Sequence, residues 1–161
     1  MIHLYLSLGS NMGDRRANME AALALLDKAF GRHYERISNF IETPSWGFDS
    51  DDFLNCAVMY ALPRKRCSAE AQALEVLDAV KDIERRLGRE ENVEFDAAGR
   101  RIYHPRPIDI DILFFGTHVI GHPRLQVPHP LMAQRDFVML PLREIANRRV
   151  RSAFPDIFKM K

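Results

Sequence analysis

The chain has 161 residues, of which 47% are hydrophobic and 28% are charged. These values are typical of a globular protein of one domain with a sizeable core, and no apolar run approaches the length of a membrane span. The formal net charge of +1 argues against a chain built mainly to bind nucleic acid. Residues 1–80 contain 8 Lys and Arg against 11 Asp and Glu, whereas residues 81–161 contain 15 against 11. The second half is therefore the better candidate for holding a polyanion.

The two cysteines, Cys56 and Cys67, form neither a secreted disulfide framework nor a zinc-binding spacing. Cys56 lies in an apolar run and is expected to be a small core residue. The N-terminus lacks the basic start of a signal peptide. We therefore expect a soluble cytoplasmic protein.

The sequence pattern in the first half of the chain predicts a strand, a helix and two further strands. A strand over residues 2–8 breaks at the turn-rich segment 9–14, where Asp14 is a suitable N-cap for a helix that Gly31 closes. Residues 34–41 and 53–62 are predicted strands. The long loop between them contains the single tryptophan, and a loop of this length is often functional.

The second half begins with a long helix that Ser68 caps and that ends at Gly88. Glu84 falls on or beside the apolar face of this helix, where it either extends to the edge or faces a site. Residues 89–105 form a polar loop, with a possible short hairpin about Gly99. A last helix is predicted to begin near Arg135.

The most informative stretch covers residues 106–115, where apolar and acidic residues alternate. In a strand, Asp109 and Asp111 lie on one face about 7 Å apart, and Ile108, Ile110 and Ile112 lie on the other. Two carboxylates so close repel each other, so a cation is expected between them. Two Mg²⁺ ions about 3.5–4 Å apart would fit such a pair and could bind a phosphate chain. The alternative is a half-exposed strand with two solvated aspartates.

The predicted element order, β-α-β-β-α-β, suits an α+β, ferredoxin-like fold. In it, a four-stranded antiparallel sheet carries helices on one face, and the Asp pair lines the other face under long loops. The chain lacks a Walker motif and kinase signatures, so any nucleotide binding would be of another kind.

Several short motifs occur in one order along the chain. They are Leu8-Gly9-Ser10-Asn11-Met12-Gly13-Asp14, Thr43-Pro44, Phe53-Leu54-Asn55-Cys56-Ala57-Val58, Glu84 with Gly88-Arg89, Pro105-Arg106-Pro107-Ile108-Asp109-Ile110-Asp111-Ile112-Leu113, Pro123-Arg124-Leu125, Val127-Pro128-His129-Pro130 and Arg135-Asp136-Phe137-Val138. Together they make the chain resemble the 6-hydroxymethyl-7,8-dihydropterin pyrophosphokinases of folate biosynthesis, from about residue 2 to about residue 146.

The resemblance implies transfer of pyrophosphate from ATP to the hydroxymethyl group of the pterin, with AMP as the other product. It implies two Mg²⁺ ions on Asp109 and Asp111, with Arg89 and Arg106 as further catalytic residues. The implied pterin pocket consists of Thr43, Pro44, Trp46, Phe53, Asn55 and Phe137. The implied ATP-binding residues are Glu84, Arg89, Arg106, Ile112, Arg124, His129 and Arg135. The implied domain spans residues 1–161 and acts as a monomer on small molecules, without nucleic acid or membrane partners.

The chain departs from the family pattern at three places. The loop up to Arg106 is longer, so that Tyr103 aligns only loosely with a tryptophan of the family. His104 stands in place of a common glycine, and Asn147 in place of a frequent proline.

Other functions remain possible from the residues alone. A metal-dependent phosphohydrolase would use the same Asp pair with water as the acceptor, but it has little use for the aromatic set around Trp46. A ferredoxin-like nucleic-acid-binding module would present aromatic side chains where this chain presents Asp109 and Asp111. A catalytically inactive relative that only binds the substrates is a third possibility.

Overall fold

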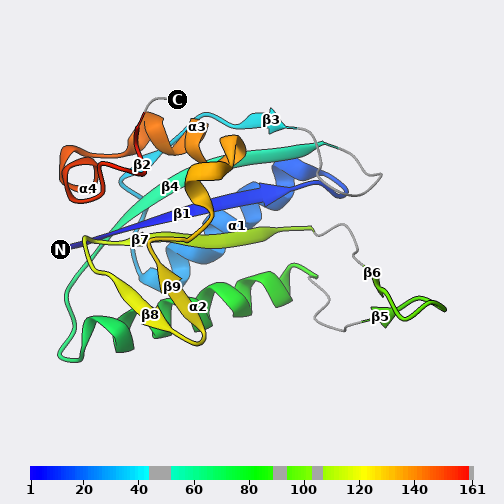
Figure 1. Cartoon of the computed structure of the whole chain (residues 1–161), viewed down its shortest axis with the longest axis horizontal. Coiled ribbons are helices and arrows are strands. Elements are labelled where there is room, and N and C mark those ends of the chain that lie inside the picture. The colour runs from blue at the N-terminus through cyan, green and yellow to red at the C-terminus, as the bar shows by residue number, and fades with distance from the viewer. Residues whose placement is uncertain (44–51, 89–93, 103–106, 160–161) are drawn as a thin grey trace.

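The fold is an antiparallel sheet with two long helices on one face and a shorter helical layer on the other (Figure 1). The computed structural model describes residues 1–43, 52–88, 94–102 and 107–159. Its elements are β1 Ile2–Ser10, α1 Arg15–Phe30, β2 Arg36–Ile37, β3 Ile41–Thr43, β4 Phe53–Leu62, α2 Ala69–Arg86, β5 Glu94–Phe95, β6 Arg101–Ile102, β7 Asp109–Phe115, β8 Ile120–His122, β9 Leu125–Val127, the 3₁₀ turn η1 Met132–Gln134, α3 Asp136–Ile145 and α4 Arg148–Ala153.

The strand order of the main sheet is β2-β4-β1-β7, and β3 also pairs with β4. The pairs β1–β4, β1–β7, β2–β4 and β3–β4 are all antiparallel. This arrangement confirms the predicted α+β, ferredoxin-like fold. The predicted single strand over residues 34–41 is two short strands instead. Between them, the Ser38 hydroxyl accepts a hydrogen bond from the Ala57 N–H, at 2.8 Å.

The two long helices begin where the sequence predicts. The Asp14 side chain accepts from the Ala17 N–H at 3.1 Å, and the Ser68 side chain accepts from the Ala71 N–H at 3.0 Å. Both bonds satisfy donors that a helix start otherwise leaves unpaired. Gly31 ends α1 with a φ of 65°, a conformation that a residue with a Cβ rarely adopts.

The main core lies between the sheet and helices α1 and α2. Alternate residues of the central strands point into it, including Leu6 and Leu8 of β1 and Ile110 and Ile112 of β7. Cys56 is fully buried there, as predicted. The isoleucine face of β7 therefore packs beneath the helices, which leaves Asp109 and Asp111 on the opposite face.

A second core forms on that opposite face, over only part of the sheet. Tyr5, Met59 and Phe114 pack there against α3 and α4. Phe154 and Phe158 from the C-terminal segment stack on Phe114, with ring centroids 5.4 and 5.9 Å away. The end of the face that carries the two aspartates lies outside this core.

The other strands form two small hairpins. One pairs β5 with β6, and Figure 1 shows it projecting away from the sheet. It confirms the hairpin predicted about Gly99, whose φ is 79°. The other pairs β8 with β9.

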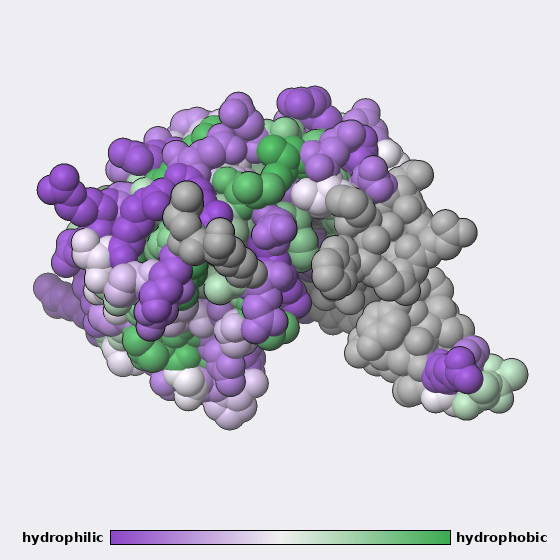
Figure 2. All heavy atoms as spheres, turned by 45° about the horizontal axis from the view of Figure 1, so that its top comes forward, coloured by the Kyte–Doolittle hydropathy of each residue, from purple (hydrophilic) through white to green (hydrophobic). Residues whose placement is uncertain are grey.

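Figure 2 shows hydrophilic side chains over much of the visible face, broken by smaller hydrophobic areas. No helix in the described part of the chain is long and apolar enough to cross a membrane.

Candidate active site

The register of three neighbouring strands brings predicted site residues into one row. Gly9 of β1 lies opposite Asn55 of β4 on one side and opposite Asp109 of β7 on the other. Two residues away, Ser7 lies between Ala57 and Asp111. Residues directly opposite one another share a face of the sheet. Asn55, from the predicted pterin pocket, and the two aspartates therefore lie on the same face.

Burial and the neighbouring carboxylate both disfavour negative charge at Asp111. Burial, and then the neighbouring Asp109 carboxylate, raise the pKa of Asp111 to about 6. Arg135 and Lys81 act in the opposite direction, and Glu84 acts in the same direction. The protein therefore holds Asp111 where negative charge is costly unless a cation neutralises it.

Glu84 supports this strand directly. Its side chain is 1% exposed, and its Oε2 accepts a hydrogen bond from the backbone N–H of Ile110 at 3.0 Å. Ile110 stands between Asp109 and Asp111, on the edge strand of the sheet. The apolar-face position of Glu84 thus corresponds to a buried contact with the strand of the site, and not to an extension into solvent.

Lys81 is a site neighbour that the sequence pattern did not single out. Its Nζ lies 3.6 Å from Glu84 Oε1, and its charge acts on Asp111. The spacing of Lys81 and Glu84 could have indicated this, because a residue three positions before Glu84 lies on the same side of a helix.

His129 and Arg135 reach the same region from the segment after β9. The His129 N–H donates to the Leu113 carbonyl of β7 at 3.0 Å. Burial and then Arg135 lower the pKa of His129, against a smaller opposing effect of Asp109. Both His129 and Arg135 therefore lie within electrostatic reach of the Asp pair, and His129 favours its neutral form.

Three residues predicted for the pterin pocket gather beside Gly9. Asn55 Nδ2 donates to Thr43 Oγ1 at 2.6 Å. A Cβ added at Gly9 would lie 2.9 Å from Asn55 Oδ1 and 3.5 Å from Phe53 Cδ1. The absence of a side chain at Gly9 thus leaves the space that Asn55 and Phe53 occupy.

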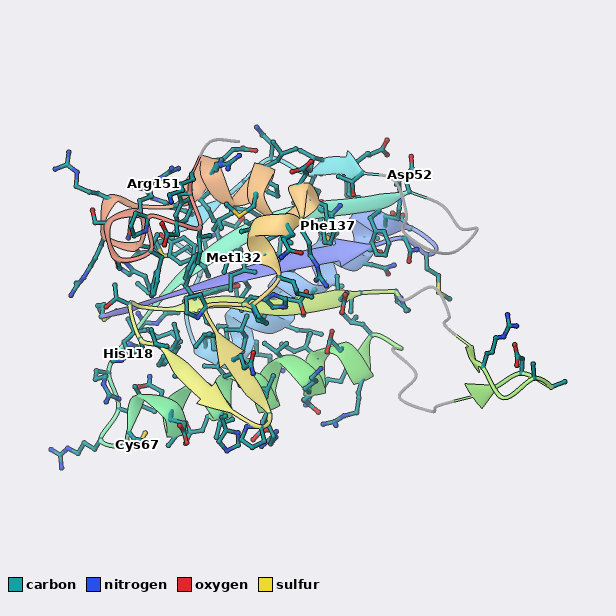
Figure 3. All side chains as sticks on the ribbon, viewed as in Figure 1. Asp52, Cys67, His118, Met132, Phe137 and Arg151 are labelled. Carbon is teal, nitrogen blue, oxygen red and sulfur yellow. The ribbon has the colours of Figure 1, made fainter. Side chains whose placement is uncertain are left out.

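Phe137, at the start of α3, is half-buried and packs beside the second core. The Arg135 guanidinium lies 5.7 Å from its ring centroid. Figure 3 shows Phe137 toward the same end of the sheet as Asp52, which precedes β4. An aromatic ring and a cation thus lie at the end of the sheet that carries Asn55 and Asp109.

The structure does not bring every predicted residue to the Asp pair. Arg124, in the turn between β8 and β9, forms an ion pair with Asp78 of α2. The Ile112 side chain lies in the main core, so a contact with ATP would have to come from its backbone. The predictions for Pro44, Trp46, Arg89 and Arg106, and the departures at Tyr103 and His104, lie outside the described residues.

The residues at this end of the sheet suit a hard divalent cation. Among the described residues, no group of three or more His, Cys, Asp and Glu side chains is placed to hold a metal ion. Mg²⁺, however, is commonly held by one or two carboxylates, with waters and substrate phosphates as its remaining ligands. Asp109 and Asp111 supply these oxygens, and a bound cation would oppose the burial and the Asp109 charge that raise the pKa of Asp111.

A sheet face with paired carboxylates, nearby cations and an aromatic ring defines a site of the class suited to metal-assisted transfer of phosphoryl groups. The sequence comparisons give the particular family. The model of the 7,8-dihydro-6-hydroxymethylpterin-pyrophosphokinase family matches residues 5–147, and the chain belongs to this family.

Curated relatives agree with this assignment. A 2-amino-4-hydroxy-6-hydroxymethyldihydropteridine pyrophosphokinase of Porphyromonas gingivalis is 41% identical over 148 residues, which cover 91% of this chain and 92% of that protein. The enzyme of the same name from Aquifex aeolicus is 35% identical over 146 residues, covering 90% of this chain and 81% of that protein. A mitochondrial folate synthesis bifunctional protein of Pisum sativum is 37% identical over 148 residues, which are 26% of its length.

Proposed function

We propose that the chain transfers pyrophosphate from ATP to the hydroxymethyl group of 6-hydroxymethyl-7,8-dihydropterin in folate biosynthesis. The products are AMP and the pterin diphosphate. Family membership supports the reaction. The structural observation that supports it most is the row of Asn55, Gly9 and Asp109, in which the Asn55 residue lies on the same face as the carboxylate pair.

Asp109 and Asp111 would hold two Mg²⁺ ions. Bound there, the ions would neutralise phosphate charge and polarise the substrate oxygens. Glu84 supports this role because its bond to the Ile110 N–H fixes the backbone between the two carboxylates. Precise placement matters because pyrophosphoryl transfer depends mainly on positioning and charge neutralisation.

The pterin would lie over Asn55 and Thr43, with Phe53 and Phe137 against its ring. The Asn55 amide offers both a donor and an acceptor to the polar edge of a heterocycle. An aromatic ring stacks favourably on a planar ligand. We assign Pro44 and Trp46 to the same pocket on the basis of the family resemblance alone.

ATP would lie beside the aspartates, toward Arg135, His129 and Glu84. Arg135 supports this assignment because its positive charge reaches both Asp111 and His129. Arg124 would first have to leave Asp78 to contact phosphate. Arg89, Arg106 and the Ile112 backbone complete the proposed set, again from the resemblance.

In the reaction, the pterin hydroxyl oxygen attacks the β-phosphorus of ATP. The bond between that phosphorus and the oxygen that bridges it to the α-phosphate breaks, AMP leaves with that oxygen, and the proton of the pterin hydroxyl is released to solvent. The side chains of the site hold the acceptor oxygen and the triphosphate in line. The neighbouring cations, Arg135 and Lys81, offset the charge of the phosphates.

One incubation tests the proposal. ATP, Mg²⁺ and 6-hydroxymethyl-7,8-dihydropterin are mixed with the protein, and AMP is followed with and without the pterin and with EDTA. We expect AMP only when pterin and metal are both present. Asp111→Ala should lose turnover while its circular dichroism spectrum is unchanged, and the control Asp156→Ala, at an 87% exposed acid, should keep it.

Other outcomes would support other functions. Phosphate or ADP released without pterin would indicate a hydrolase that uses the same Asp pair. Bound pterin without any product would indicate a binding protein. The net charge of +1 gives no support to a nucleic-acid-binding module.

We propose that the chain is a single domain that works as a monomer in the cytoplasm, on small molecules, without nucleic acid or membrane partners.

A further inference from the structure

Arg15, the first residue of α1, contacts the two strands that carry residues of the proposed pterin pocket. It follows directly after the segment 8–14, but it is not among the site residues that the family resemblance implies. Its Nη2 donates to Glu42 Oε1 at 2.5 Å, and its Nη1 donates to the Asp52 carbonyl oxygen at 2.8 Å. One guanidinium therefore reaches both β3 and the residue that precedes β4.

The two contacts lie directly beside a pair of pocket residues. In the register of β3 and β4, Thr43 lies opposite Phe53. Glu42 and Asp52 are the residues that precede them in the chain. Arg15 thus joins the two strands next to Thr43 and Phe53.

The position of Thr43 matters because its hydroxyl contacts Asn55. Asn55 Nδ2 donates to Thr43 Oγ1 at 2.6 Å. The strand that carries Thr43, β3, has three residues and pairs with β4. A strand so short has few ladder hydrogen bonds to fix its place, so a side chain that holds its end has a large influence on where Thr43 lies.

The start of α1, from which Arg15 extends, is itself held to β1. Asn18 Nδ2 donates to Ser10 Oγ at 3.3 Å and to the Met12 carbonyl oxygen at 2.8 Å. Ser10 is the last residue of β1, and the Asp14 side chain caps the helix. Figure 1 shows this turn at the end of the sheet where β4 begins. Arg15 therefore connects the end of β1 to β3 and β4.

The chemistry of arginine suits this bridge. A guanidinium is planar and presents its N–H donors in a fixed fork, so two of its nitrogens hold two acceptors at a fixed separation. The Arg15 side chain is 28% exposed and the Glu42 side chain is 60% exposed. Ion pairs as exposed as this contribute little to stability. The contact is therefore better suited to fixing positions than to stabilising the fold.

We propose that Arg15 is a positioning residue for the pterin. Its two contacts fix the end of β3 against the start of β4, and so set where Thr43 and the Asn55 amide meet the polar edge of the ring. This inference rests on the proposed function. Small displacements of positioned groups are costly to binding and turnover. ATP, proposed to lie beside the aspartates and toward Arg135, depends on Arg15 much less.

The test compares Arg15→Gln with the control Arg16→Gln by steady-state kinetics. Arg15→Gln should raise the KM for 6-hydroxymethyl-7,8-dihydropterin by about fivefold or more, and should change the KM for ATP by less than about twofold. Arg15→Lys should show most of the same loss, because an ammonium keeps the charge but not the fork. Arg16→Gln makes the same change of charge at the next residue, which contacts Glu20 and the Phe40 ring, and should behave as the wild type does.

A double-mutant cycle shows whether the effect runs through the bridge. Glu42→Gln should also raise the KM for the pterin. The variant with both changes should lose little more than Arg15→Gln alone, because the two residues form one contact. Losses that simply multiply would show that Arg15 and Glu42 act independently, against the proposal.

A measurement without turnover separates this inference from the proposed function. In the ligand-free ¹⁵N-labelled chain, Arg15→Gln should shift the Asn55 side-chain NH₂ signals and the Thr43 amide, and Arg16→Gln should shift neither. If the wild type makes no AMP, the proposed function fails, and these signals still decide whether Arg15 holds Thr43 and Asn55 in place. Where Arg15→Gln does not fold, Arg15→Lys gives the same readouts.

Three results would overturn the proposal. They are unchanged Asn55 and Thr43 signals in Arg15→Gln, equal rises of KM for pterin and ATP, and equal losses in the Arg15 and Arg16 variants.

Discussion

At the scale of single residues, Asp111 is held where burial and the neighbouring Asp109 disfavour its ionised form. Its pKa is raised to about 6, whereas an aspartate in an unfolded chain titrates near 4. Between these values the folded protein binds more protons than the unfolded one. The stability of the metal-free protein should therefore fall as pH rises through this window.

The prediction is measured by thermal unfolding in EDTA between pH 4 and pH 7. The wild type should lose on the order of 2 kcal/mol of stability relative to Asp111→Asn across the window, because the variant lacks the titrating group. Mg²⁺ should recover more of this stability at pH 7 than at pH 4. Identical pH profiles for the two proteins would contradict the role of burial at Asp111.

Gly9 is the second residue whose identity matters. Gly9→Ala would place a methyl carbon 2.9 Å from Asn55 Oδ1, so Asn55 must move. We expect weaker pterin binding, by about tenfold (about 1.4 kcal/mol), and a smaller effect on ATP. Calorimetric titration measures both.

Gly121→Ala is the matched control, because a Cβ at Gly121 meets nothing within 4 Å. It should bind both ligands as the wild type does. If Gly9→Ala weakened both ligands equally, the change would lie in the sheet as a whole and not at Asn55.

At the scale of elements, α2 is coupled to β7 through Glu84. Glu84→Ala would leave the Ile110 N–H without its buried acceptor and should destabilise the protein by about 1–3 kcal/mol. Glu84→Gln keeps an oxygen at that position and should cost less. Hydrogen exchange of the Ile110 amide should accelerate in the alanine variant.

The control on the same helix is Glu75→Ala, an exposed acid paired with Lys65. Surface ion pairs contribute little, so its stability should stay within about 1 kcal/mol of the wild type. Unchanged exchange at Ile110 in Glu84→Ala would show that the carboxylate does not protect this edge strand.

The start of α3 presents Phe137 to the site. Phe137→Ala should weaken pterin binding by about 1–3 kcal/mol through lost stacking and burial, and should barely change ATP binding. Leu140→Ala, at a 53% exposed position of the same helix, should change neither. An equal loss for both ligands would instead assign Phe137 to the structural core.

At the scale of the whole molecule, the sheet has two distinct ends. Part of its open face is covered by α3, α4 and the aromatic residues of the C-terminal segment. The end with Asn55 and the aspartates lies outside that core. The central strand β1 runs between these two ends, from Ile2 to Ser10.

Local patterns predicted much of this fold. The helix starts at Asp14 and Ser68 follow from side chains that bond the first turn, and the strand at residues 53–62 follows from its apolar run. Some short elements escaped prediction because they depend on distant partners. The strands β2 and β3 separate at Ser38, whose hydroxyl bonds Ala57 of the neighbouring strand. The helix α4 begins where Asn147 caps it, within a segment that has little periodicity of its own.

The sequence by itself determined the two long helices, the alternation that puts Asp109 and Asp111 on one face, and the family. These depend on neighbouring residues or on the order of motifs. Only the tertiary structure decided that Gly9 separates Asn55 from Asp109, that Glu84 binds Ile110, and that Arg124 pairs with Asp78. The physical reason is that strand register and helix packing are set by contacts between residues far apart in the chain, which no local period encodes.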